Sequence, residues 1–156
     1  MLTIIYILLG AALALFAYLC VKAANKSLKY PFQSWEKSDL PFITIDVQGH
    51  SLNMITDSAA AVSVIRRDVL ENLTYEPNSR NVNLASISGD GVKSEVVAIP
   101  INIKGKEIKT DFVVYDGNDI AGFRRHGIIM DGILGVEFLK KTGGIVDFST
   151  QTVKFP

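Results

Sequence analysis

From residue 41 onward, apolar and polar residues alternate in short stretches separated by turn residues, a pattern typical of β-strands with one buried face. Residues 42–47 and 51–56 flank Gln48-Gly49-His50 and predict a β-hairpin that ends directly before Asp57. Further strands are predicted at Val82–Ile87, Val92–Ile103, Ile108–Tyr115, 143–148 and 152–155. Helical spacing predicts short helices over residues 62–73 and 135–141, the second ended by Thr142-Gly143-Gly144. The pattern therefore predicts a mostly-β domain with one or two short helices.

A different pattern occupies the N-terminus, where Thr3 to Val21 include no charged residue. About 19 such residues are enough to cross a hydrocarbon layer ~30 Å thick as a helix. A cleaved signal peptide is disfavoured because no basic residue precedes the stretch. A lipoprotein signal is disfavoured because Tyr18 and Leu19, rather than small residues, precede Cys20. The sequence therefore predicts an uncleaved single-pass membrane anchor.

The residues after the apolar stretch set the expected topology and domain limits. Lys22, Lys26 and Lys29 follow it, and the positive-inside rule then favours the cytoplasmic face for the rest of the chain. A polar segment containing Pro31 comes next and is typical of a linker. We predict a transmembrane anchor over residues 1–24, a juxtamembrane linker over residues 25–40 and a folded domain over residues 41–156.

Composition argues against nucleic-acid binding, disulfide bonds and metal sites in this protein. The 156 residues include 16 basic and 16 acidic side chains, and no basic cluster is typical of a nucleic-acid-binding surface. The only cysteine, Cys20, lies in the apolar stretch, so the domain has no disulfide and depends on its core for stability. His50 and His126 lie in predicted turns without partners at metal-ligand spacing, so we predict neither a metal site nor a cofactor.

One acid stands out from the apolar pattern. Asp57 ends an apolar strand and is followed by Ser58 and three alanines rather than by a turn. An unpaired charge in a protein core costs several kcal/mol unless it is protonated. Asp57 is therefore either a structural cap or a working acid, whereas Asp131 and Asp147 are typical strand-end or turn acids and are not assigned to catalysis.

Two motifs resemble the retropepsin-like aspartic protease family. Asp57-Ser58-Ala59 at a strand end resembles its Asp-Thr/Ser-Gly-Ala loop, and Ile133-Leu134-Gly135 resembles the later Ile-Leu-Gly strand that packs beside that loop. The order of parts from Pro41 to Phe155 also resembles that family. The resemblance implies an all-β, retropepsin-like closed β-barrel with one or two short helices, preceded here by a single transmembrane helix.

The resemblance also implies roles for individual residues. In this family each of two chains supplies one acid, and the two carboxylates share a proton and activate a water that attacks a peptide carbonyl. The catalytic role then falls on Asp57, and Ser58 matches the hydroxyl that links the two acid loops. Substrate-binding positions are implied at Ala59 and Ala60 in the loop and, at the tip of a flap, at Ser88, Gly89, Asp90 and Gly91.

Two alanines depart from the family pattern. Ala59 stands where the family has glycine, and a methyl group there would crowd the substrate or require a backbone angle that favours glycine. Ala61 stands where viral members commonly have a further acid, so substrate binding is expected to differ from theirs.

These observations predict a membrane-anchored, homodimeric aspartic endopeptidase that acts on peptide or protein substrates. The helix carries Gly10 and Ala14 at a spacing that favours helix pairing, which is consistent with a dimer. Two alternatives stay open. One is a non-catalytic module of the same fold that binds a peptide or dimerises a partner at the membrane, and the other is an unrelated β-domain that serves as a scaffold.

Overall fold

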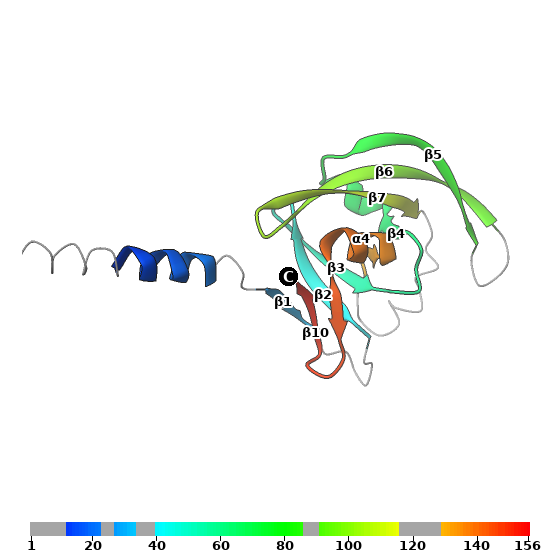
Figure 1. Ribbon diagram of the computed structural model, residues 1–156. Helices are drawn as coiled ribbons and strands as arrows, with labels where there is room; N and C mark the ends of the chain where they lie inside the picture. The colour runs from blue at the N-terminus through cyan, green and yellow to red at the C-terminus, as the bar shows by residue number, and fades with distance from the viewer. Residues whose placement is uncertain (1–11, 23–26, 34–39, 86–90, 116–128) are drawn as a thin grey trace, which may run out of the picture.

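A computed structural model describes residues 12–22, 27–33, 40–85, 91–115 and 129–156 (Figure 1). The strands are, in chain order, β1 (Leu28–Pro31), β2 (Phe42–Val47), β3 (His50–Thr56), β4 (Ser63–Arg66), β5 (Glu76–Ala85), β6 (Gly91–Ile103), β7 (Lys106–Tyr115), β8 (Gly132–Leu134), β9 (Ile145–Asp147) and β10 (Thr152–Phe155). Two helices of the domain are α2 (Arg67–Leu70) and α4 (Val136–Thr142). The domain is therefore mostly β, with short helices.

The strands form two sheets. Seven strands lie in the order β2-β3-β8-β4-β7-β6-β5, and three lie in the order β1-β10-β9. The short strand β8 lies between β3, to which it is parallel, and β4, to which it is antiparallel. Strands β5, β6 and β7 arch over α4, while β1 and β10 lie on the other side of the domain (Figure 1). This order places the loop between β3 and β4 at the end of β8.

Two hairpins share one turn chemistry. Gln48 and Gly49 join β2 to β3 with φ angles of 57° and 84°, and Lys104 and Gly105 join β6 to β7 with φ angles of 57° and 77°. Positive φ at both central residues is the type I′ geometry that matches the twist of paired strands. In each turn the glycine N–H donates to a side-chain oxygen three residues earlier. Gly49 donates to Oδ1 of Asp46, and Gly105 donates to Oδ1 of Asn102. The predicted hairpin before Asp57 is confirmed.

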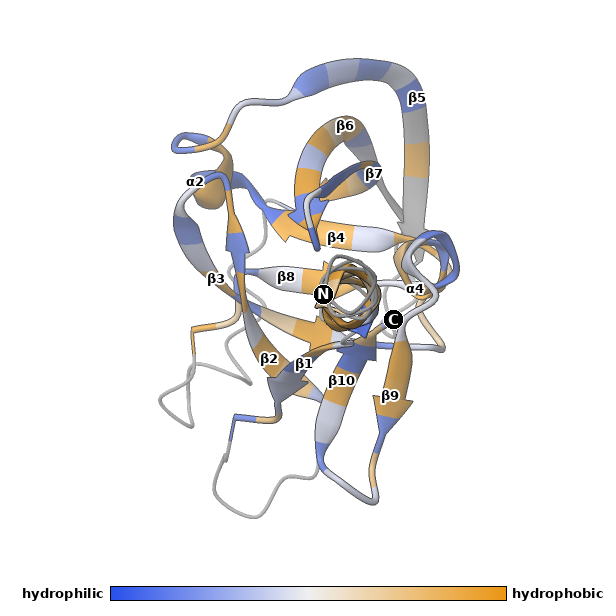
Figure 2. Cartoon of the chain, turned by 60° about the vertical axis from the view of Figure 1, so that its left-hand side comes forward, coloured by the Kyte–Doolittle hydropathy of each residue, from blue (hydrophilic) through white to orange (hydrophobic). Residues whose placement is uncertain are grey.

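The core consists of the alternate residues of the strands. Figure 2 shows hydrophobic bands separated by more polar ones along several strands. The residues that β6 contributes to the main core occur at every second position, and they are Val97, Ile99, Ile101 and Ile103; the paired strand β7 contributes Ile108, Phe112 and Val114. α4 closes the core through Phe138, whose ring meets that of Phe155 edge to face at 5.7 Å. The left-handed Gly143, with φ of 65°, ends α4 as predicted.

The structure corrects three predictions about the fold. Residues 62–73 are not one helix, because residues 63–66 form β4 between two other strands and only the four residues of α2 are helical. The seven-stranded sheet is not closed by hydrogen bonds among the described strands, since β2 and β5 remain its two edges. The third difference concerns residues 28–31, which were assigned to the linker but pair with β10 as β1.

Tyr30 explains why β1 joins the fold. Its ring packs against Phe155 at 5.6 Å. Burial, with a smaller contribution from the charge of Asp46, raises the pKa of its hydroxyl.

The predicted strand Val82–Ile87 begins earlier, at Glu76, and its last two predicted residues lie outside the described part of the chain.

At the N-terminus, residues 12–22 are helical. No helix within the described ranges combines the length and apolar character needed to span a membrane. The predicted anchor, Thr3 to Val21, lies partly outside those ranges, because residues 1–11 are not described.

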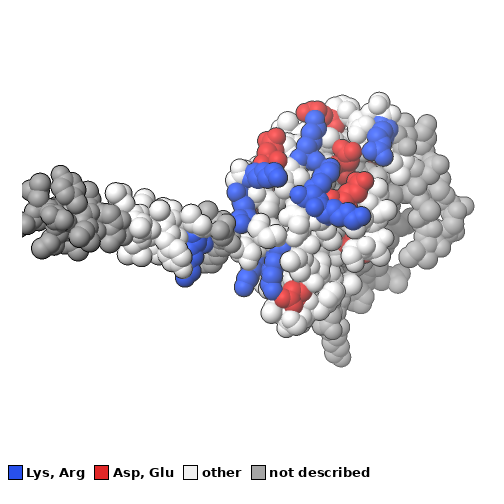
Figure 3. Space-filling model, in the orientation of Figure 1, with Lys and Arg blue, Asp and Glu red and all other residues white. Residues whose placement is uncertain are grey.

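The surface carries charges of both signs. Figure 3 shows Lys and Arg side chains among Asp and Glu side chains on the face that it draws. Exposed ion pairs among the described residues include Arg67 with Glu95 at 2.9 Å and Lys109 with Glu76. Exposed pairs of this kind contribute little to stability.

Candidate active site

Asp57 follows directly on β3 and is fixed from two sides. Its N–H donates to the carbonyl of Leu134 in β8 at 3.0 Å. The preceding residue, Thr56, is buried and donates both its N–H and its hydroxyl to the carbonyl of Pro41, each at 2.9 Å. The backbone that carries the Asp57 carboxylate is therefore held between β8 and the segment that enters β2.

The loop after Asp57 folds back onto its own acid. The N–H of Ala59 donates to Oδ1 of Asp57 at 2.8 Å, and the N–H of Ala60 donates to the Asp57 carbonyl at 3.3 Å. The carbonyl of Ala60 then accepts the N–H of Val136, the first residue of α4, at 2.8 Å. These bonds tie the orientation of the carboxylate to the start of α4.

Gly135 makes this close approach possible. A Cβ atom at that position would lie 2.6 Å from the carbonyl carbon and oxygen of Val62 and 2.9 Å from the carbonyl oxygen of Ala60. Its N–H donates to the buried hydroxyl of Ser63 at 3.0 Å. The Ile133-Leu134-Gly135 step therefore needs glycine because the acid loop lies directly against it.

A hollow of about 330 Å³ lies beside the acid. Asp57, Ser58 and Thr56 supply its polar lining, and the rest is mostly apolar. Phe148, which also lines it, is 60% exposed. Exposed aromatic and aliphatic groups beside a carboxylate are typical of a surface that another molecule covers.

The structure brings four of the predicted site residues into one loop. Asp57 and Ala60 are half-buried, and Ser58 and Ala59 are exposed. Asp57 lies where β3 leaves the core, at the strand end predicted for it, and it lines the hollow. Among the described residues the Ser58 hydroxyl has no hydrogen-bond partner.

Ala59 does not adopt the left-handed backbone conformation that favours glycine. Within the described ranges, the non-glycine residues with positive φ are Gln48, Lys104 and Gln151, so φ of Ala59 is negative. The loop therefore does not require, at position 59, the backbone angle that favours glycine.

The predicted flap is described only in part. Gly91 is the first residue of β6, and β5 and β6 pair as the two arms of a long, curved hairpin (Figure 1). Ser88, Gly89 and Asp90 lie outside the described residues, as does His126. No group of His, Cys, Asp and Glu side chains in the described ranges could hold a metal ion.

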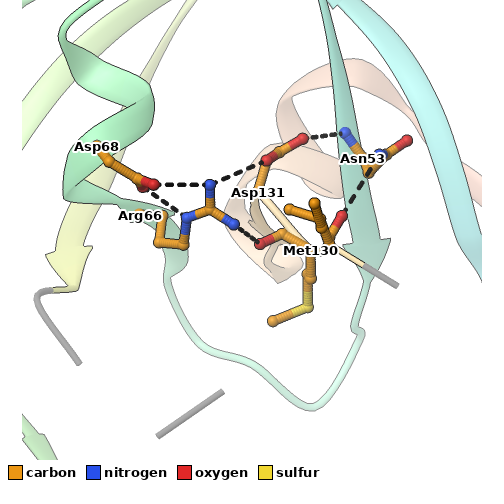
Figure 4. Close-up of polar contacts among 6 residues, drawn as sticks. Asn53, Arg66, Asp68, Met130 and Asp131 are labelled. Carbon is orange, nitrogen blue, oxygen red and sulfur yellow. Dashed lines mark hydrogen bonds and ion pairs between the residues drawn. The ribbon is translucent and has the colours of Figure 1, made fainter. Parts of the chain in front are cut away.

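Sequence reasoning missed a polar cluster at the other end of β8. Arg66 ends β4 and pairs with Asp68 through both carboxylate oxygens, at 2.5 and 2.9 Å (Figure 4). Hydrogen bonding to Arg66 lowers the pKa of Asp68. Asp131, which directly precedes β8, faces the same guanidinium. The sequence analysis predicted residues 62–73 as a helix, and a helix there gives no reason to expect Arg66 beside the residues that precede β8.

Comparison with known proteins agrees with this arrangement. A family model described as aspartyl protease matches residues 43–138, which is more than half of the chain. This chain belongs to the aspartyl protease family. The match runs from β2 to α4, so it includes the Asp57 loop, the described arms of the β5–β6 hairpin and β8.

Comparison with solved structures concerns the fold alone. A retropepsin-like aspartic protease from Rickettsia conorii is 12% identical, with a TM-score of 0.51, covering 83% of this chain and 90% of that one. The EIAV protease complexed with the inhibitor HBY-793 is 20% identical, with a TM-score of 0.49 and coverage of 71% and 95%. The retroviral protease-like domain of Ddi1 from Leishmania major is 17% identical, with a TM-score of 0.47 and coverage of 72% and 85%. A comparison with curated protein sequences found no match. The fold is retropepsin-like.

Proposed function

We propose that this aspartyl protease family member is a homodimeric aspartic endopeptidase in which each chain contributes Asp57. The observation that carries the proposal is the Asp57 carboxylate itself. It sits at the mouth of a hollow, holds one hydrogen bond from the Ala59 N–H, and pairs with no cation among the described residues. One such loop per chain supplies one acid, so a pair requires a second copy.

The proposed reaction is hydrolysis of a peptide bond. One carboxylate of the pair is ionised and the other protonated. The ionised carboxylate accepts a proton from water as the water oxygen attacks the peptide carbonyl, and the protonated one donates to the carbonyl oxygen. Proton transfer to the peptide nitrogen then accompanies cleavage of the carbon–nitrogen bond. Because the pair must hold one proton, the rate is expected to fall at both higher and lower pH.

The exposed groups around the hollow fit a surface that a second copy covers. Ser58 is exposed and its hydroxyl lacks a partner among the described residues, so it is available to a second loop. Leu40 and Phe148 line the same hollow and are 38% and 60% exposed. In the proposed dimer, Ser58 links the two acid loops, and Ala59, Ala60 and the hairpin tip at Ser88, Gly89, Asp90 and Gly91 contact the substrate.

The test compares Asp57, which follows the β2–β3 hairpin, with an acid in the first strand of that hairpin. The full chain is incubated with a mixed peptide library, and Asp57→Asn is expected to lower turnover on the order of 10³-fold or more while the protein stays folded. The matched control is Asp46→Asn, an exposed residue of β2 next to the turn, and this variant is expected to keep wild-type turnover. Wild-type rates in the Asp57 variant would refute the mechanism.

A metal-dependent mechanism is tested in the same assay. The proposed carboxylate pair needs no metal, so a chelator is expected to leave the rate unchanged. Complete inhibition that added zinc reverses would contradict the proposal and direct attention to the histidines.

Membrane attachment is a separate part of the proposal and rests on the uncharged stretch from Thr3 to Val21 and the lysines after it. We expect this stretch to remain in the mature protein, with the protease domain on the cytoplasmic face. Digestion of a C-terminal tag by protease added outside intact cells or spheroplasts would reverse this topology.

A further inference from the structure

The position of the Asp57 backbone depends on a very short strand. β8 comprises only Gly132–Leu134, and at its end the Leu134 carbonyl accepts the Asp57 N–H at 3.0 Å. Gly132, at its start, is tightly enclosed, because a Cβ atom there would lie 2.3 Å from the Val64 carbonyl oxygen. A three-residue strand makes few ladder hydrogen bonds, so its position depends strongly on how its ends are held.

The entry to β8 is held from the β3 side by Asn53. The N–H of Asp131 donates to the Asn53 carbonyl, and the N–H of Asn53 donates to Oδ2 of Asp131, both at 2.8 Å. Figure 4 shows Asp131 between Asn53 on one side and Arg66 on the other. The side chain of Asp131 is only 13% exposed, so these contacts are partly shielded from water.

The entry is held from the β4 side by Arg66. Its backbone N–H donates to the Asp131 carbonyl at 3.0 Å, and its guanidinium Nη1 donates to the Met130 carbonyl at 3.0 Å. Nη2 lies 3.6 Å from Oδ1 of Asp131 while the guanidinium also holds Asp68. The Arg66 side chain is 17% exposed. A planar guanidinium can serve all these acceptors at once, whereas a lysine ammonium is a single point charge.

We propose that Arg66 and Asp131 are positioning residues for the protease reaction. They fix the entry of β8, β8 fixes the Leu134 carbonyl, and that carbonyl fixes the backbone of Asp57. This inference rests on the proposed function. Neither residue touches the reacting atoms, but a displacement of about 1 Å at a catalytic group can lower a rate on the order of 100-fold.

The test uses two neighbouring arginines in the full chain. Arg66→Lys is expected to lower kcat on the order of 10- to 100-fold with KM within about twofold of wild type, because the acid is misplaced while the substrate surface is unchanged. Arg67→Lys is the matched control, since Arg67 pairs with Glu95 at an exposed position and is 49% exposed itself. It is expected to keep the wild-type kcat. Equal losses in both variants, or wild-type kcat in Arg66→Lys, would overturn the proposal.

A second readout needs no turnover. Amide hydrogen exchange measured by NMR is expected to be faster at Asp57 in Arg66→Lys and unchanged at Ile99 in the core of β6. If the wild type cleaves nothing, the proposed function fails, but faster exchange at Asp57 still supports the positioning contact and unchanged exchange refutes it. If Arg66→Lys does not fold, Asp131→Asn replaces it. That change keeps an acceptor for the Asn53 N–H, removes the charge facing Arg66, and is expected to shift both readouts in the same direction by less.

Discussion

Two aspartates lie at opposite ends of β8, and their surroundings differ. Asp131 precedes the strand, accepts the Asn53 N–H, faces the Arg66 guanidinium and is 13% exposed. Asp57 follows β3 beside the far end of the strand, and its carboxylate accepts one N–H, from Ala59 two residues later in the chain. An acid whose oxygens are occupied by fixed partners stabilises structure, whereas an acid with oxygens left available can accept hydrogen bonds from another molecule.

The hollows beside the two acids differ in the same way. The one at Asp131, about 360 Å³, is lined largely by polar side chains, including His50, Ser51 and Asn72. The one at Asp57, about 330 Å³, is lined largely by apolar groups, including Phe148. A polar hollow can remain open to water, but an apolar one favours a covering molecule. The comparison therefore supports the proposal that the Asp57 side faces a second copy.

Mixing wild-type and variant subunits tests the difference between Asp57 and Asp131 most directly. When wild-type chains are mixed with a ninefold excess of Asp57→Asn chains, random pairing leaves about a tenth of the wild-type chains in wild-type dimers, so activity is expected to fall about tenfold. The same excess of Asp131→Asn chains is expected to lower the activity much less, because every mixed dimer retains two Asp57 carboxylates and one of them lies in a wild-type chain. Peptide cleavage after unfolding and joint refolding measures both. An equal loss of activity with the two variants would contradict the different roles of Asp57 and Asp131.

The two glycines of this strand region offer a test by stability. Gly132→Ala and Gly135→Ala would each place a Cβ within 2.6 Å or less of backbone atoms, and each is expected to lower the free energy of unfolding by about 2–3 kcal/mol. Gly49→Ala is the control. Space is open around Gly49, although its φ of 84° makes an alanine there cost about 1 kcal/mol. Urea denaturation measures all three, and a control loss as large as the others would contradict tight packing around β8.

Acid titration probes the Asp131 side. The pKa of Asp68 is lowered in the folded state by Arg66, so the unfolded chain takes up the proton first as the pH falls. The stabilisation is therefore full above the unfolded value near 4 and is lost as the pH drops through the lower folded pKa. Because Asp68 is 59% exposed, we expect less than about 1 kcal/mol. The stability difference between wild type and Asp68→Asn is expected at pH 7 and should vanish in strong acid, as urea midpoints at both pH values would show.

The parts of the fold predicted correctly from the sequence are those with local signals. The β2–β3 hairpin has alternating residues and a Gln-Gly turn, and α4 has helical spacing and a glycine at its end. The Asp57 loop and the Ile133-Leu134-Gly135 step were found because a family pattern covers both.

The parts that were missed depend on contacts between distant segments. β4 has apolar residues at positions that suit a helix as well as a strand, and its pairing with β7 and β8, which decides the matter, joins residues more than 45 apart in the chain. Arg66 and Asp131 are likewise 65 residues apart, so no spacing rule brings them together. The strand β1 was not predicted for the same reason, because its partner β10 lies more than 120 residues later in the chain.

Ala59→Gly is expected to have the smallest effect and separates an active enzyme from an inert peptide-binding module. The Ala59 N–H binds Asp57 in this structure and would do so equally with glycine, and the negative φ of Ala59 shows no need for a glycine-only angle. We therefore expect kcat/KM to change by about threefold or less. Stability is expected to fall by about 0.4–1 kcal/mol, because glycine adds conformational freedom to the unfolded chain. Single-turnover assays at high protein concentration, with Asp57→Asn as the blank, measure the first quantity and urea denaturation the second. An inert wild type whose Ala59→Gly variant cleaves peptides would show instead that the methyl group has disabled the protease, and the binding module would then be the better description.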